Sequence, residues 1–231
     1  MSQTNHNPVS RIRRCSVWAA FTGTVAACAL VVSGAGAAGA VTPPTHEDDY
    51  QEIAKAVGSA APELQVVKAA DTNDGSLVAS TDSSSVSLPV GDGEAIRVEG
   101  NDGAEAFGIG LPEGTDVLGA GIASDGTVVY TTDTDAQIAV QVHDSGVRVL
   151  VVIESYDGPT RFDYPITLSE DGAAVLNPDG NVVVVSPDGE PVAFAEAPWA
   201  VDALGQEVPT HFELSDKGWV RVGDTVAGCF L

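Results

Sequence analysis

AQIAVQVHDSGVRVLVVIES, residues 136–155, has the pattern of two β-strands joined by a tight turn. In its first half Ile138, Val140 and Val142 alternate with polar residues, which is the period of a half-buried strand. The second half is apolar at nearly every position, which is typical of a central strand covered on both faces. Asp144-Ser145-Gly146 supplies turn residues between the two runs, so the segment predicts an antiparallel hairpin.

Strand and turn signals of the same kind continue through residues 86–231. Two turns are near copies, Asn177-Pro178-Asp179-Gly180 and Ser186-Pro187-Asp188-Gly189, and both have type I preferences with a Gly that tolerates the left-handed conformation. The valines at 182–185 between them predict a strand, and the spacing of the turns predicts a β-meander. We therefore expect residues 86–231 to form an all-β domain, either an antiparallel β-sandwich or a distorted barrel with meander hairpins.

Residues 1–40 have the three parts of a secretory signal peptide. Three of the ten basic residues lie at positions 11, 13 and 14, an apolar run covers residues 17–32, and small residues with an A-x-A cleavage pattern follow. All 33 acidic residues lie after residue 46. We expect the leader to be removed on export, so that the protein is secreted and extracellular.

Two other fates of the N-terminus stay open. Cys28 ends a run that resembles a lipoprotein cleavage box, and an uncleaved segment over residues 15–41 is long enough to cross a bilayer and anchor the protein in a membrane. Arg13-Arg14 also resembles a twin-arginine export signal. The Gly, Thr and Ser content of the run and its A-x-A ending favour removal instead.

Residues 41–68 predict a short helix, and residues 69–85 predict a linker. Thr45 and Asp48 have the spacing of a capping box at the helix start, and Gly58 is expected to end the helix. One apolar face follows the helical period, at Tyr50, Ile53, Ala54 and Val57. The linker segment is rich in Ser, Thr, Asp, Ala and Gly, which is the composition of a flexible chain without a packed core.

Composition narrows the classes of partner. The formal net charge is −23 at pH 7, and such a surface repels nucleic acid and anionic lipid and keeps a protein monomeric by self-repulsion. Of the three cysteines, only Cys229 lies beyond the leader, so the exported chain has no intrachain disulfide. We expect a monomer with no nucleic-acid partner and no membrane contact after signal cleavage, and with an unknown extracellular protein or glycan as its partner.

The segment PWAVDALGQEVPTHFE, residues 198–213, holds the candidate ligand-binding residues Trp199, Asp202 and His211. Two prolines bracket its central part, and a tryptophan is seldom left exposed without a reason. Aromatic side chains of extracellular β-domains often bind sugars or peptides, but large aromatics more often fill cores. A binding face therefore competes with a structural plug, in which Trp199 closes one end of the core.

No catalytic motif is recognisable by its spacing, so the leading hypothesis is a non-enzymatic interaction or scaffold module. His143 and His211 allow a secreted hydrolase with a His/Asp-dependent site as an alternative, since such sites are defined by geometry. A calcium-stabilised β-module is a further alternative, because calcium binds clustered carboxylate and carbonyl oxygens. Asp and Asn are also common in turns, where they hydrogen-bond the backbone, so these clusters need not bind a metal ion. Apart from calcium, no cofactor is expected. The calcium candidates are Asp71, Asn73, Asp74, Asp133 and Asp135.

Several of these segments occur together in one family. PWAVDALGQEVPTHFEL, preceded by GLPEG, SDGTVVY, the hairpin segment and PTRFDYPITL, resembles secreted actinobacterial proteins of unknown function that carry a PWAxDxxGxxVPTxxE-type motif in a β-rich domain. The resemblance covers residues 86–222 and implies a β-rich fold and export, without an activity. Similar members continue into a tyrosine-proline-valine segment and a variable C-terminal module. If activity in the family lies in that module, the resemblance implies that this chain corresponds to the carrier domain.

Overall fold

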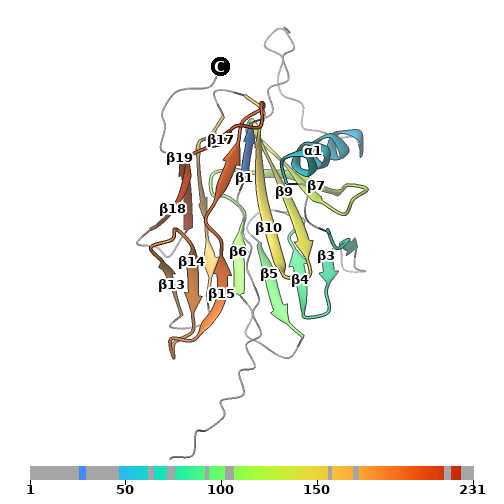
Figure 1. The fold of residues 1–231 in the computed structure, drawn as a ribbon. Coiled ribbons are helices and arrows are strands. Elements are labelled where there is room, and N and C mark those ends of the chain that lie inside the picture. The colour runs from blue at the N-terminus through green and yellow to red at the C-terminus, as the bar shows by residue number, and fades with distance from the viewer. Residues whose placement is uncertain are drawn as a thin grey trace, which may run out of the picture.

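The computed structural model describes residues 26–29, 47–61, 65–71, 76–91, 94–101, 107–155, 158–168, 172–215 and 220–224. In this part of the chain the fold is strand-rich, with one helix and several antiparallel sheets (Figure 1). None of the sheets formed by the described strands closes on itself. The predicted all-β character is therefore confirmed.

The described strands form four sheets. The largest has seven strands in the order β17 (Glu207–Val208), β16 (Trp199–Val201), β1 (Ala26–Ala29), β10 (Gly146–Ile153), β9 (Ala136–His143), β8 (Val128–Thr132) and β7 (Val117–Ile122). The second has six, in the order β12 (Ile166–Thr167), β6 (Phe107–Gly110), β5 (Ala95–Gly100), β4 (Ser84–Leu88), β3 (Leu77–Ser80) and β2 (Ala70–Asp71). Two sheets have three strands each, β11 (Arg161–Tyr164), β19 (Val220–Asp224) and β18 (Thr210–Leu214) in one, and β13 (Ala173–Leu176), β14 (Val182–Val185) and β15 (Pro191–Ala195) in the other.

The predicted hairpin lies near the middle of the seven-stranded sheet and is confirmed. β9 and β10 pair antiparallel over their whole length, with His143 opposite Gly146 at the turn. Both faces of β10 are covered, as its apolar sequence predicts. Val151 belongs to the main core, and Leu150 belongs to a smaller cluster beneath the helix.

The main core joins side chains from all four sheets. Buried members include Ile96 of the six-stranded sheet, Ile138 of the seven-stranded sheet, and Tyr164 and Val182 of the two small sheets. Because these side chains belong to one buried cluster, the four sheets share one apolar interior. Burial of this apolar surface is the main favourable term in the stability of such a fold.

The predicted helix is α1 (Glu47–Ala60), and it covers the other face of the seven-stranded sheet (Figure 1). A polar contact holds it in place, since Gln51 Oε1 accepts hydrogen bonds from the backbone N–H and the hydroxyl of Ser124, at 3.0 and 2.7 Å. Its apolar face is buried as predicted. The smaller cluster that it forms with the sheet contains Ile53, Val57, Val129, Ala139, Leu150 and Val152.

The end of α1 differs from the prediction. The helix passes through Gly58 and ends at Ala60, and the N–H of Ala61 still donates to the carbonyl of Val57 at 2.9 Å. A glycine costs a helix only about 1 kcal/mol relative to alanine, which tertiary packing of the apolar face offsets. The proposed cap Thr45 lies outside the described residues.

The two predicted type I turns are present on either side of β14. The N–H of Gly180 donates to the carbonyl of Asn177 at 3.1 Å, and that of Gly189 donates to Ser186 at 2.9 Å. Both glycines have positive φ, +83° and +81°, which residues with a Cβ seldom adopt. The meander β13–β14–β15 is therefore confirmed.

The prediction of a flexible linker over residues 69–85 is wrong for the residues that the structure describes there. β3 and the first residues of β4 pair antiparallel within the six-stranded sheet, and Leu77, Ala79 and Ser84 are buried. Their polar composition is compatible with burial because Thr81 Oγ1 hydrogen-bonds the hydroxyl and the backbone of Ser84. The burial of β3 and β4 alternates with a period of two, but the small and hydroxyl-bearing side chains there do not alternate in hydropathy.

Most of the predicted signal peptide, residues 1–25 and 30–40, lies outside the described residues. Its residues 26–29 form β1, which pairs parallel to β10 on one side and to β16 on the other. A search of the described residues finds no helix that is both long and apolar enough to span a membrane.

Candidate functional site

Trp199 lies on β16 at the border of the cluster beneath α1. Its side chain is half-buried and packs against this cluster together with Val201, on the sheet face that α1 covers. Ala200 between them is buried on the opposite face. The indole therefore has packing partners within the fold.

Asp202 organises the loop that joins β16 to β17. Its Oδ1 accepts hydrogen bonds from the N–H groups of Leu204 and Gln206, both at 2.8 Å. The main chain adds two bonds, from Asp202 N–H to the carbonyl of Gln206 and from Gly205 N–H to the carbonyl of Asp202, each 2.9 Å long. This fixed loop carries Leu204 at its tip, where the side chain is 75% exposed.

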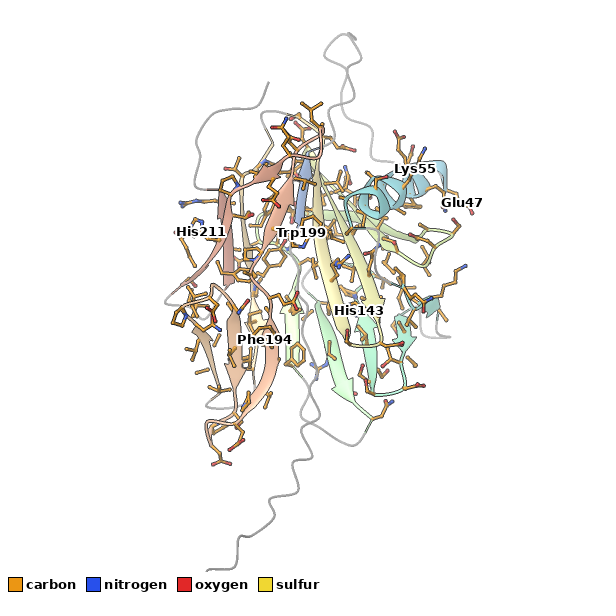
Figure 2. The ribbon with its side chains drawn as sticks, viewed as in Figure 1. Glu47, Lys55, His143, Phe194, Trp199 and His211 are labelled. Atoms are coloured by element: carbon orange, nitrogen blue, oxygen red, sulfur yellow. The ribbon has the colours of Figure 1, made fainter. Side chains whose placement is uncertain are left out.

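His211 lies on β18, in another sheet. Its Nε2 is 3.2 Å from Oε1 of Glu213 on the same strand, and both side chains are partly exposed, 39% and 44%. Figure 2 shows Trp199 near the middle of the view and His211 on the outer strand β18. Among the described residues no hydrogen bond or ion pair joins Trp199, Asp202 and His211, so each has its own local role.

A second group of polar side chains lies at the β9–β10 turn. The hydroxyl of Ser145 is 2.9 Å from Nδ1 of His143, which is the distance of a nucleophile from its general base. The pKa of His143 is lowered, mainly by burial and then by the positive charge of Arg148, while Asp144 opposes the shift. The lowered pKa favours the neutral imidazole, and its Nδ1 accepts from Ser145 in the tautomer that carries the proton on Nε2.

Further polar residues extend this group along β9 and β10, where Gln141 pairs with Arg148. Gln141 is 3% exposed, and its Nε2 donates to Thr127 Oγ1 at 3.1 Å. Arg148 Nη1 donates to the carbonyl of Ala61 at 3.5 Å. Burial lowers the pKa of this guanidinium, and the negative charge of Glu196 partly opposes the shift. The alternation of β9 predicts that Gln141 and His143 share a face, but not that this face is buried. In the sequence, the only feature that singles out Arg148 is its charge within the otherwise apolar run of β10.

Two of the calcium candidates, Asp133 and Asp135, hydrogen-bond loop residues. Asp133 Oδ1 accepts the N–H of Asp116 at 3.0 Å, and Asp135 Oδ2 accepts the hydroxyl of Ser155 at 2.6 Å. Asp71 ends β2, and Asn73 and Asp74 lie outside the described residues. Within the described part of the chain, no three His, Cys, Asp or Glu side chains gather as metal ligands.

A scan of protein-family models finds no match to this chain, and a search of curated proteins also finds none. The resemblance to secreted actinobacterial proteins therefore stays a prediction. The function of the chain is to be inferred from the geometry of its own side chains.

Proposed function

We propose that this chain is exported and acts outside the cell as a non-enzymatic interaction module, with its sheets packed as a β-sandwich. The observation that carries the proposal is the loop between β16 and β17. Asp202 fixes the backbone of this loop by hydrogen bonds, and the side chain of Leu204 is exposed to solvent. An exposed leucine gains free energy only when another surface covers it. A leucine offers apolar contact and no hydrogen bonds, so a protein partner fits better than a glycan.

The hydrogen bonds of the loop strengthen this proposal. A loop that is already ordered loses little conformational entropy on binding, so more of the contact energy appears as affinity. Asp202 and Gly205, whose φ is +76°, fix the loop without any help from a ligand. Under this proposal Asp202 positions the apolar anchor, and Trp199 packs the strand that precedes it.

We expect Leu204→Ser to lower capture of the extracellular partner at least tenfold, since the loss of a central anchor costs more than about 1.4 kcal/mol. Leu118→Ser is the matched control, because Leu118 is 52% exposed on β7, at the opposite edge of the same sheet. The measurement is crosslinking and pull-down from the native secreted fraction with wild type and both variants. Equal capture by wild type and Leu204→Ser would contradict the proposal.

The Ser145–His143 contact favours a second candidate function, a secreted hydrolase. Ser145 is exposed in the turn and would act as nucleophile, while His143 would accept its proton. If purified protein cleaves an ester, peptide or glycoside substrate, we expect Ser145→Ala to lose nearly all of that activity. His211→Ala is the control and should retain it. Activity that survives in Ser145→Ala removes this candidate.

A further inference from the structure

β1 occupies a position one strand wide between β10 and β16. Ala26 lies opposite Leu150 on one side and Trp199 on the other, and Cys28 lies opposite Val152 and Val201. Both pairings are parallel, and they are the parallel pairs among the described strands, whose other pairings are antiparallel. β10 and β16 do not pair with each other, because β1 separates them.

This strand belongs to the apolar run of the leader that export is expected to remove. Removal would leave the facing edges of β10 and β16 about 10 Å apart, which is two strand spacings. Each edge would then present unpaired N–H and C=O groups, and such groups are costly when water cannot reach them. An added strand that satisfies both edges at once is therefore favoured.

From this placement, and resting on the proposed export and interaction function, we infer that the processed protein binds an extended segment of a partner protein between β10 and β16. The segment takes the place of β1, parallel to β10. This is recognition by strand addition, in which main-chain hydrogen bonds supply affinity and flanking side chains supply specificity. Here the added strand completes the sheet on both sides, so it makes two ladders where an edge strand makes one.

The flanking residues define the chemistry of this partner segment. We call the position of β1 between β10 and β16 the slot. On the face beneath α1 it is bordered by Leu150 and Trp199, and on the main-core face by the buried Val151 and Ala200. Both faces are apolar, so the inserted residues must be uncharged, and the strand seated there consists of Ala, Ala, Cys and Ala. All 33 acidic residues lie beyond the leader, so the processed chain is strongly acidic and favours basic residues on either side of the inserted stretch.

The test uses a labelled peptide with the sequence of residues 25–30, Ser in place of Cys28, and a lysine at each end. The protein is the chain purified from the medium of an exporting host, with its N-terminus determined by intact mass. We expect saturable binding by fluorescence anisotropy. A control peptide with Pro in place of Ala27 should bind at least about tenfold more weakly, because proline removes a ladder donor. The unprocessed chain, in which β1 is present, should not bind the peptide.

Hydrogen exchange locates the binding. Peptide should protect the amides of β10 and β16 and leave those of β7, at the far edge of the sheet, unchanged. Equal affinity of the two peptides, or protection at β7, contradicts the proposal that a segment binds between β10 and β16. So does a processed chain that binds peptide only after truncation at residue 224, because its own C-terminal residues are then the occupant. An exported chain that retains residues 26–29 also overturns the slot but leaves the Leu204 result standing. A chain that never reaches the medium overturns export itself.

Discussion

Above pH 10 the free energy of unfolding is expected to fall by about 2.7 kcal/mol per pH unit. The cause is Tyr130 and Tyr164, which are 0% and 2% exposed within the main core. Burial raises the pKa of both phenols far above the ordinary value of 10. In the unfolded chain they lose their protons near pH 10, whereas in the folded chain they keep them. The unfolded state therefore binds fewer protons, and stability is lost as the pH rises from 10 toward the raised folded pKa.

Phenylalanine substitutions test this expectation, because they remove the ionising group and keep the ring. The double variant Tyr130→Phe/Tyr164→Phe should lose most of the alkaline slope, measured by urea unfolding at pH 7, 10, 10.5 and 11. At pH 7 each substitution should raise the free energy of unfolding by roughly 1 kcal/mol, since neither hydroxyl has a hydrogen-bond partner among the described residues. Tyr50→Phe, at a half-buried ring on α1, is the control. A double variant that loses stability as steeply as wild type contradicts the expectation.

Local patterns in the sequence predict much of this fold, because they act over a few residues. The alternation of Ile138, Val140 and Val142 and the turn at residues 144–146 specify the central hairpin without reference to the rest of the chain. The turns around β14 depend only on residues within each turn. The strand residues between 77 and 85 escape prediction, because Ser and Thr dominate there and their hydrogen-bond partners are set by the pairing of β3 with β4.

The candidate sites depend on contacts that are distant in sequence, and sequence patterns predict them less well. Gln141 and His143 occupy the polar face of an alternating strand, which predicts exposure to water. Both are nevertheless buried, and residues far earlier in the chain pack at this part of the hairpin, where Ala61 accepts from Arg148 and Val67 donates to Val142. Asp202 is the opposite case. Its position ahead of Leu204 and Gly205 is typical of a turn, and the structure shows a turn.

The docking of α1 on the sheet leads to the second large effect, a loss of about 1–3 kcal/mol of stability in Gly121→Ala. Gly121 lies on β7 directly beneath Tyr50, and an added Cβ would overlap the Cδ2, Cε2 and Cζ atoms of that ring. Either the ring leaves its site or the strand shifts, and both weaken the contact between helix and sheet. Urea unfolding at pH 7 measures the loss.

Gly119→Ala is the matched control on the same strand, because its added Cβ would meet only Thr131 Oγ1, at an ordinary 3.5 Å. It should be nearly neutral, since a smaller entropy of the unfolded chain offsets small contact changes. Tyr50→Ala removes the obstacle, so Gly121→Ala should cost little in that background, and the coupling between the two sites should be 1 kcal/mol or more by double-mutant cycle. If Gly121→Ala costs the same with and without the Tyr50 ring, the overlap is not the cause. The helix would then be held on the sheet mainly by Ile53 and Val57, which are buried in the cluster beneath it.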